Sequence, residues 1–297
     1  MASKVRIASL LKMKQDAKPL VMVTAYDFPT GALADESEVD IILVGDSLGT
    51  CVLGLDSEIK VRMDMMVHHT AAVRCGVKNA LLVGDMPFMS YHESEELALR
   101  NAARLMQEGG AEAVKLEGGR HVIDKVTRIV NSGIPVMGHI GLTPQSVHAL
   151  SGHRIQGRDV ANAKRLMEDA HMLQDAGCFA IVLECVTREV ADEISQSLTV
   201  PTIGIGSGEK CDGQVLVMTD LIGLTQRKTP SFVKQYAHVS RQIKRAIRAY
   251  AADVREGKYP DREHSFSTDN KNKLDPKELR DFVKTIAPIP EETKGNE

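Results

Sequence analysis

The segments IILVGDSLG (residues 41–49) and ALLVGDMPF (80–88) decide the fold of this chain. Each is a short apolar run that ends in Gly-Asp. A run that is apolar throughout, rather than alternating, is typical of a parallel strand buried on both faces. Because the carboxyl ends of parallel strands meet at one edge of a sheet or barrel, we expect Asp46 and Asp85 to lie close together there.

Six further runs of the same kind accompany these two, at residues 20–26, 113–116, 135–138, 179–184, 201–205 and 214–218. Helical patterns separate most of them, at 64–75, 94–108, 121–132, 159–176 and 187–198, and a long helix is predicted over 231–256. Strand–helix units repeated about eight times predict an α/β fold of the (β/α)8 TIM-barrel type rather than an open doubly wound sheet. The last two runs are the weakest unit, because the residues between them are too few for a full crossover helix.

The predicted domain organisation is a catalytic barrel over residues 1–267 and a C-terminal extension over 268–297. The first residues, MASKVRIASLLKMKQD, read as a short amphipathic helix that precedes the barrel. Beyond residue 268 the chain becomes polar and contains proline, which is typical of a mobile extension with at most one short helix.

The composition of the 297-residue chain favours a cytoplasmic enzyme that acts on small molecules. The net charge is only −3 with both signs interspersed, which argues against a nucleic-acid binder. No stretch approaches the roughly 20 apolar residues of a membrane span. The five cysteines are odd in number and show no CxxC spacing, so we expect free thiols in a reducing compartment.

Asp46 and Asp85, on neighbouring strands, indicate a site for a hard divalent cation. Oxygen ligands suit Mg²⁺, which keeps several waters and completes its shell with substrate oxygens. Zinc is less favoured, because no histidine pair has the spacing of metal ligands. The Gly-rich turn GIGSG (204–208) is a weak phosphate signal, and close backbone packing explains it equally well.

Three more ionisable residues lie at strand ends, and each has two possible roles. Lys115 and Glu117 are one residue apart on a strand and therefore share a face. Lys115 is expected to hold a substrate carboxylate, or else to pair with Glu117. Glu117 is expected to contact a metal or a metal-bound water, or else to form that salt bridge. Glu184 ends an apolar run, where partial desolvation makes a carboxylate a usable general base; the alternative is a cap for the helix that follows.

The chain as a whole resembles the ketopantoate hydroxymethyltransferase (3-methyl-2-oxobutanoate hydroxymethyltransferase) family. The resemblance covers about 240 residues in order. The matching segments are TAYD (24–27), LVGDSLG (43–49), HHTAAVRCG (68–76), DMPFMSY (85–91), VKLEGG (114–119), GHIGLTPQSV (138–147), IQGR (155–158), VLEC (182–185), IGIGSG (203–208), CDGQVLV (211–217) and HSF (264–266).

This resemblance implies a reaction and its reactants. The family's enzymes are Mg²⁺-dependent (β/α)8 barrels that transfer a hydroxymethyl group from 5,10-methylenetetrahydrofolate to C3 of 3-methyl-2-oxobutanoate. The product is 2-dehydropantoate, on the route to pantothenate and coenzyme A. The resemblance also implies a homodecamer.

The resemblance also implies a role for each strand-end residue. The metal ligands fall on Asp46, Asp85 and, directly or through water, Glu117. The 2-oxo acid contacts fall on Asp46, Ser47, Asp85 and Lys115, with His139 lining the substrate site, and the catalytic base falls on Glu184.

Two other functions compete with this interpretation. Other Mg²⁺-dependent barrels of the isocitrate-lyase and phosphonopyruvate type act on 2-oxo acids and place a Gly-Asp-Ser unit after an early strand. They typically carry a Lys-Cys-Gly-His loop that this sequence lacks. A non-catalytic barrel is the other alternative, and the intact acidic positions argue against it.

Overall fold

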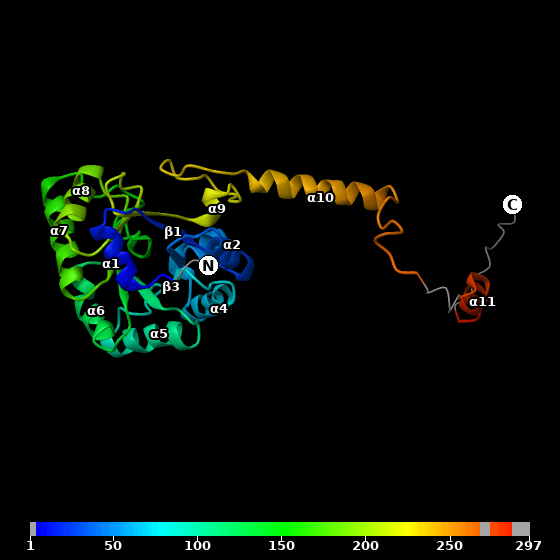
Figure 1. The fold of residues 1–297 in the computed structure, drawn as a ribbon, viewed down its shortest axis with the longest axis horizontal. Coiled ribbons are helices and arrows are strands. Elements are labelled where there is room, and N and C mark those ends of the chain that lie inside the picture. Colours follow the sequence, from blue (N-terminus) through cyan, green and yellow to red (C-terminus); the bar gives the residue numbers. More distant parts are fainter. Residues whose placement is uncertain (1–3, 268–273, 287–297) are drawn as a thin grey trace, which may run out of the picture. The chain divides into compact units, whose positions relative to one another are not determined.

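Eight parallel strands form the centre of the fold in this computed structural model, which describes residues 4–267 and 274–286. The strands close into a barrel in sequence order, and β1 pairs with both β2 and β8 (Figure 1). Their bounds are β1 Leu20–Thr24, β2 Ile41–Val44, β3 Leu81–Asp85, β4 Ala113–Glu117, β5 Val136–Gly141, β6 Ala180–Glu184, β7 Thr202–Ile205 and β8 Gly213–Leu216. The predicted (β/α)8 class is confirmed.

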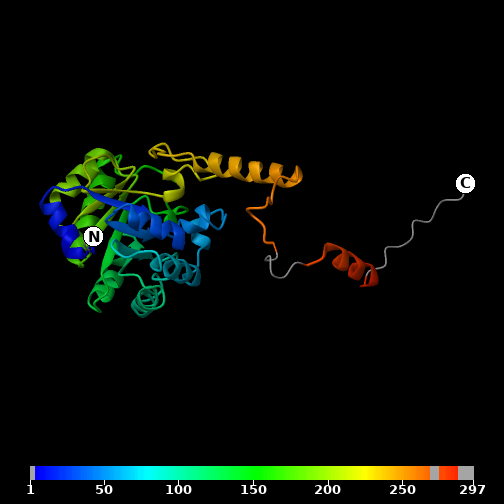
Figure 2. The same cartoon turned by 45° about the vertical axis from the view of Figure 1, so that its right-hand side comes forward.

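Helices surround the barrel, and α1, the predicted N-terminal helix, precedes β1 (Figure 2). The bounds are α1 Ile7–Gln15, α2 Phe28–Glu36, α3 Leu48–Cys51, α4 Met63–Arg74, α5 Glu95–Gln107, α6 Ile123–Val130, α7 Val160–Asp175, α8 Arg188–Ser197 and α9 Met218–Leu221, with 3₁₀ turns η1 Glu58–Lys60, η2 Arg120–Val122 and η3 Pro144–Ser146. Side-chain caps begin several of them: Ser94 accepts from Leu97 N and starts α5, and Asp159 accepts from Asn162 N and starts α7.

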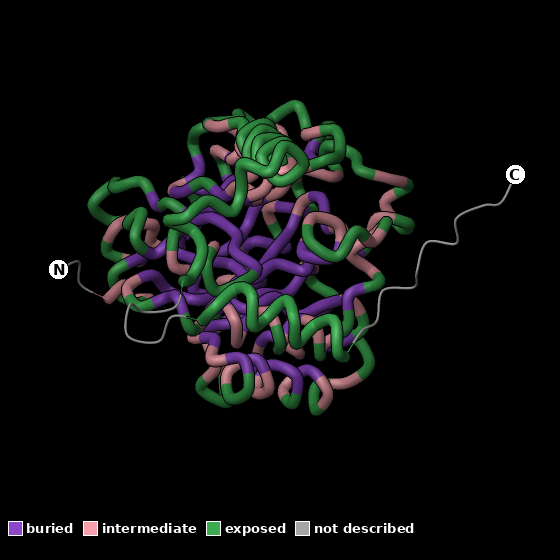
Figure 3. The backbone as a smooth tube through the Cα atoms, turned by 90° about the vertical axis from the view of Figure 1, so that its right-hand side faces the viewer, coloured by how far each residue is buried: buried purple, intermediate pink, exposed green. Residues whose placement is uncertain are grey.

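Two apolar clusters hold the barrel together. One lies inside it and includes Met22, Leu43, Met137 and Ile203, and the other lies between the strands and the surrounding helices. Figure 3 shows the strands as the buried centre and the outer faces of the helices as exposed. Burial on both faces explains why the strands are apolar throughout.

The connection between β7 and β8 contains no helix among the described residues. Both strands nevertheless pair in parallel, with Ile203 opposite Gly213. The weakest predicted unit therefore contributes its two strands but no crossover helix. A loop over 206–212 returns the chain to the start of β8.

The chain divides into two compact units, Met1–Val239 and Ser240–Glu297. The second carries most of α10 (Val239–Arg255) and α11 (Pro276–Ile286), neither of which buries a residue. The boundary predicted at residue 267 stays a prediction. Much of the predicted extension, residues 268–273 and 287–297, lies outside the described residues, and α11 agrees with the single short helix expected there.

The long helix α10 begins at Val239, eight residues later than the sequence pattern predicted. The amides of Tyr236 and Val239 donate to the carbonyls of Leu221 and Ile222, at the end of α9. Tyr236, and Val239 at the start of α10, therefore bind backbone carbonyls at the end of another helix, so α10 does not extend back to residue 231. No helix of the described residues is long and apolar enough to cross a membrane.

Candidate active site

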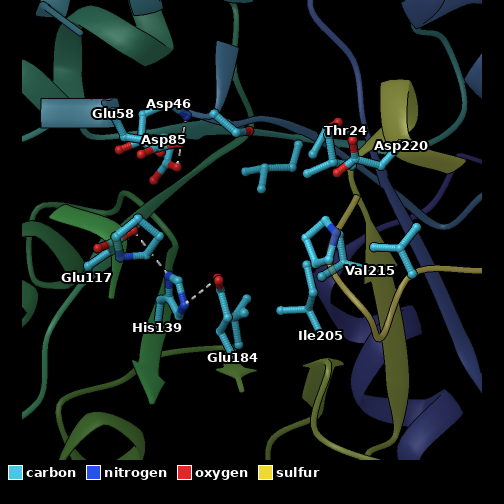
Figure 4. Close-up of a pocket in the computed structure, with 18 of the residues that line it drawn as sticks. Thr24, Asp46, Glu58, Asp85, Glu117, His139, Glu184, Ile205, Val215 and Asp220 are labelled. Carbon is cyan, nitrogen blue, oxygen red and sulfur yellow. Dashed lines mark hydrogen bonds and ion pairs between the residues drawn. The ribbon is translucent and has the colours of Figure 1, made fainter. Parts of the chain in front are cut away.

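A cavity of about 200 Å³ lies at the carboxyl ends of the strands. Its apolar wall comes from inward-facing strand residues that include Leu43, Val182 and Val215. Its lining also contains every site residue predicted from the sequence, which are Asp46, Ser47, Asp85, Lys115, Glu117, His139 and Glu184. Figure 4 labels all of them except Ser47 and Lys115. Side chains up to 138 residues apart in the chain thus share one small space.

Asp46 and Asp85 are in contact, as their strand-end positions predict. The backbone N–H of Asp46 donates to Asp85 Oδ2 at 3.2 Å, and both residues are at most 4% exposed. Burial and the neighbouring carboxylates of Asp85 and Glu117 raise the pKa of Asp46 well above its ordinary value. Burial also raises the pKa of Asp85, although Lys115 opposes the rise. A cation between these groups would relieve that repulsion.

Lys115 is buried among these carboxylates. Its Nζ lies 3.0 Å from Asp85 Oδ1, 4.0 Å from Glu117 Oε1 and 3.3 Å from His139 Nδ1. Burial lowers the pKa of Lys115, but the surrounding carboxylates outweigh it and raise the pKa above its ordinary value. Lys115 therefore stays protonated, and its nearest acidic partner is Asp85 rather than Glu117.

Glu117, His139 and Glu184 form a row along one side of the cavity (Figure 4). His139 Nδ1 lies 3.4 Å from Glu117 Oε1, and its Nε2 lies 3.3 Å from Glu184 Oε2. Burial alone would raise the pKa of Glu117, but the contacts with His139 and Lys115 and the N–H of Gln145 lower it overall. Burial and Lys115 each tend to lower the pKa of His139. The contacts with Glu117 and Glu184 outweigh both, so the pKa of His139 is raised above its ordinary value.

Glu184 is the most accessible acid of this row, with 18% of its side chain exposed. The helix after it, α8, has Thr187 at its N-cap and no side-chain capping hydrogen bond. The alternative role of Glu184 as a cap for that helix therefore has no support in the structure. Its carboxylate reaches the cavity and is available to a ligand there.

The donor set fits a hard cation held by two carboxylates. Among the described residues, no group of three or more His, Cys, Asp or Glu side chains has metal-site geometry. Asp85 Oδ1 is nevertheless buried without a hydrogen bond, although it is in ion contact with Lys115. Two carboxylates with waters and substrate oxygens are a common Mg²⁺ arrangement, so the pair Asp46 and Asp85 suffices chemically. The ligand role of Glu117 stays a prediction.

Asp27 shows that a strand-end acid is not necessarily part of the site. It follows β1 but accepts from Thr30 N at 2.8 Å and caps α2. Its neighbour Tyr26 is buried, with its hydroxyl 2.9 Å from Ser47 Oγ.

In the GIGSG turn, Gly206 has φ +65° and lies against the ring of Phe232. No helix begins after the turn, which supports packing rather than a phosphate cradle.

The sequence analysis missed several polar residues of the cavity. Glu58, Asp220 and Arg227 also line it: Glu58 lies near Asp46 and Asp85, and Asp220 lies across the cavity from them (Figure 4), with Arg227 Nη2 3.6 Å from Asp220 Oδ2. Glu58 and Asp220 lie in the single-turn elements η1 and α9 and Arg227 lies in a loop, and segments this short give no periodicity that could point to them. Gln145, which contacts Asp46, was also missed, although it lies within the segment GHIGLTPQSV that supports the family resemblance.

The fold and the site together define a (β/α)8-barrel enzyme, because buried acids and a lysine converge at the strand ends where such enzymes carry their active sites. The family model for ketopantoate hydroxymethyltransferase matches residues 4–262. The chain belongs to the ketopantoate hydroxymethyltransferase family.

Close relatives agree with this assignment. The 3-methyl-2-oxobutanoate hydroxymethyltransferase of Carboxydothermus hydrogenoformans is 52% identical over 264 residues, which cover 89% of this chain and 96% of the relative. The enzyme of the same name from Bacillus licheniformis is 52% identical, covering 87% and 94%. The predicted family and the predicted enzyme class, hydroxymethyl transfer, are confirmed.

Solved structures with low sequence identity share the fold. A phosphonopyruvate hydrolase in complex with oxalate and Mg²⁺ is 12% identical with a TM-score of 0.57, covering 95% of this chain and 98% of that one. A 2,3-dimethylmalate lyase of the PEP mutase/isocitrate lyase superfamily is 13% identical with a TM-score of 0.55, covering 94% and 95%. These likenesses show the barrel alone and give the competing 2-oxo acid reaction no further support.

Proposed function

We propose that this chain transfers a hydroxymethyl group from 5,10-methylenetetrahydrofolate to C3 of 3-methyl-2-oxobutanoate in the presence of Mg²⁺, giving 2-dehydropantoate. The observation that carries the proposal is the group of three buried carboxylates, Asp46, Asp85 and Glu117, around the buried ammonium of Lys115, with the more accessible Glu184 in the same cavity. Excess negative charge in a closed space favours a bound cation. The family assignment supplies the two substrates.

Asp46 and Asp85 would hold the Mg²⁺ ion, with Glu117 contacting it directly or through water. The ion, when bound, withdraws electron density from the keto group and makes the C3 proton more acidic. This metal assignment agrees with the oxygen-only donor set and with the raised pKa of Asp46, because a cation stabilises the charged form of that buried carboxyl.

Lys115, Ser47 and His139 would orient the 2-oxo acid. The buried ammonium of Lys115 offsets the charge of the substrate carboxylate and of the developing enolate. Ser47, at the start of α3, and His139, on β5, present hydrogen-bonding groups to the same cavity. The apolar wall of Leu43, Val182 and Val215 suits the isopropyl group of the acid.

Glu184 would accept the proton from C3. Its Oε2 lies beside the His139 imidazole, whose raised pKa favours the charged form that can stabilise a carboxylate next to it. The C3 carbon of the resulting enolate forms a bond with the methylene carbon of the folate. Both bonds from that methylene carbon to the folate nitrogens break, and water supplies the hydroxyl group. The proton taken from C3 and the second proton of the water pass to the two folate nitrogens, so tetrahydrofolate is released.

Proton exchange tests this proposal before any folate is added. We expect the wild-type chain to exchange the C3 proton of 3-methyl-2-oxobutanoate for deuterium in an NMR assay, only with Mg²⁺ present. Asp85→Ala is expected to lose this exchange. Asp27→Ser, which alters a strand-end acid outside the cavity and keeps a capping oxygen, serves as the control. Normal exchange by Asp85→Ala would contradict the metal assignment.

Product formation separates this function from the competing one. Folate-dependent formation of 2-dehydropantoate is expected here. A barrel of the isocitrate-lyase or phosphonopyruvate type would act on its 2-oxo acid without folate. Absence of both exchange and product would instead favour a non-catalytic barrel.

The assembly and location are proposed from the family resemblance. We expect a homodecamer, which sedimentation equilibrium measures directly as ten times the 32.5 kDa chain mass. A cytoplasmic location agrees with the five cysteines, all of which are unpaired thiols in the structure.

A further inference from the structure

We propose that Gln145 is a positioning residue that sets how Asp46 is presented to the metal ion, an inference that rests on the proposed Mg²⁺ site. Gln145 lies in η3, after β5, and is 2% exposed. Its side chain reaches a carboxylate 99 residues earlier in the chain, at 2.9 Å from Nε2 to Asp46 Oδ2. Figure 4 places Asp46 beside Asp85 on the wall opposite His139.

The surroundings of Gln145 determine the orientation of its amide. Nε2 faces two acceptors, Asp46 Oδ2 and the carbonyl of Met86, both at 2.9 Å. Oε1 accepts from the hydroxyl of Tyr91 at 2.7 Å. The reverse orientation would set an oxygen against two oxygens, so only one orientation satisfies all three contacts.

These contacts form one directional chain of hydrogen bonds. The backbone N–H of Glu117 donates to Tyr91 Oη at 3.2 Å, and Gln145 donates to Asp46. The Tyr91 hydroxyl has two acceptors in reach, Gln145 Oε1 at 2.7 Å and the Glu117 carbonyl at 3.1 Å, and the shorter distance directs its proton to Gln145. The backbone N–H of Gln145 also donates to Glu117 Oε2 at 3.0 Å. Bonds that all point the same way polarise one another, and each member is buried. One residue therefore constrains two acids, Asp46 in the loop after β2 and Glu117 at the end of β4.

The consequence concerns the oxygens of Asp46. Because Oδ2 is occupied by Gln145, and no hydrogen bond among the described residues reaches Oδ1, Asp46 would offer a single oxygen to the ion. Hydrogen bonds behind a ligand fix its direction, and their loss typically weakens metal binding by 10- to 100-fold. Methionine at position 145 would keep the volume and the backbone N–H but remove the three side-chain hydrogen bonds, to Asp46, Met86 and Tyr91.

Binding of Mn²⁺ to the full chain, followed by EPR, tests the inference. We expect Gln145→Met to raise the Kd for Mn²⁺ by about 10- to 100-fold. Tyr91→Phe removes the hydrogen bond to Gln145 Oε1 but keeps Gln145 itself, so we expect a smaller rise in the Kd for Mn²⁺. Gln156→Met is the matched control, because Gln156 is a buried glutamine whose Nε2 donates to the Arg154 carbonyl outside the site.

A second readout separates positioning from general stability. If Gln145 orients a ligand, higher Mg²⁺ concentration restores turnover of Gln145→Met, while its melting temperature stays near that of Gln156→Met. Wild-type Mn²⁺ affinity in a folded Gln145→Met would overturn the inference. Should that variant not fold, wild-type affinity in Tyr91→Phe would overturn it. Absence of Mn²⁺ binding by the wild-type chain would instead remove the proposed metal site and this inference with it.

Discussion

Glu184 and His139 show how a strand-end carboxylate becomes chemically useful. Their side chains are 3.3 Å apart, and Glu184 alone in its row reaches partial exposure. A general base must reach both the substrate and a group that stabilises its charge, and the base proposed here, Glu184, lines the cavity and lies beside His139. The residue type and the strand end were predictable, whereas the histidine partner was not, because β5 and β6 are joined through a long helical crossover.

The variant Glu184→Gln is expected to bind 3-methyl-2-oxobutanoate yet lose turnover by about 10²- to 10⁴-fold, the usual contribution of a general base. Calorimetry of acid binding and a turnover assay measure the two effects. Glu189→Gln, in the exposed first turn of α8, is the control. Loss of turnover with intact C3–H exchange would move Glu184 to the later folate and water steps.

The variant Asp46→Asn is expected to be more stable than the metal-free wild type at neutral pH. The folded pKa of Asp46 is raised, so its deprotonation opposes folding as pH rises from the ordinary aspartate value of 3.8 through the folded pKa. The stability difference should therefore widen with pH across that window and then level off.

Urea unfolding in EDTA at several pH values measures this difference. Each 1 kcal/mol gained should raise the melting temperature by roughly 2–4 °C. Asparagine keeps an oxygen for Gln145, so that hydrogen bond is not lost. If Asp46→Asn were less stable than the wild type at every pH, burial and carboxylate repulsion at Asp46 would not destabilise the metal-free fold.

At the scale of elements, the strands carried the clearest sequence signal. All eight were predicted to within three residues at each end, because burial on both faces demands continuous apolar runs. The start of α10 was not predicted, since amides of Tyr236 and Val239 bind carbonyls at the end of α9. Local pattern cannot show that a distant helix end supplies acceptors.

Gly141, at the end of β5, is expected to tolerate no side chain. It has φ +98°, and an added Cβ would meet the carbonyl oxygen of Glu184. Gly133 has φ +84° but open space around it, so Gly133→Ala isolates the backbone strain. We expect Gly133→Ala to cost about 1 kcal/mol and Gly141→Ala clearly more, with lower activity, in urea unfolding and turnover assays. If both variants lost the same free energy of unfolding, β5 and β6 could move apart at Gly141 without a loss of stability.

For the whole barrel, ligand binding and folding are linked. Asp46 follows β2, Asp85 ends β3 and Glu117 ends β4, so the proposed ion would stabilise only the closed barrel that brings these residues together. Mg²⁺ with 3-methyl-2-oxobutanoate at about 100 times Kd should add about 2.7 kcal/mol and raise the melting temperature by roughly 5–11 °C. Thermal unfolding by circular dichroism measures the shift. EDTA should abolish it, and an equal rise in Asp85→Ala would contradict the proposed link.

The sequence by itself determined the barrel, its eight strands, the family and the acids at the strand ends. Local sequence patterns determine those properties: apolar runs, helix caps and the residue that follows each strand. Only the tertiary structure decided which partner each group has, such as Asp85 rather than Glu117 for Lys115, and Gln145 behind Asp46. Partners depend on distances of a few ångströms between side chains up to 99 residues apart, which the closure of the barrel sets.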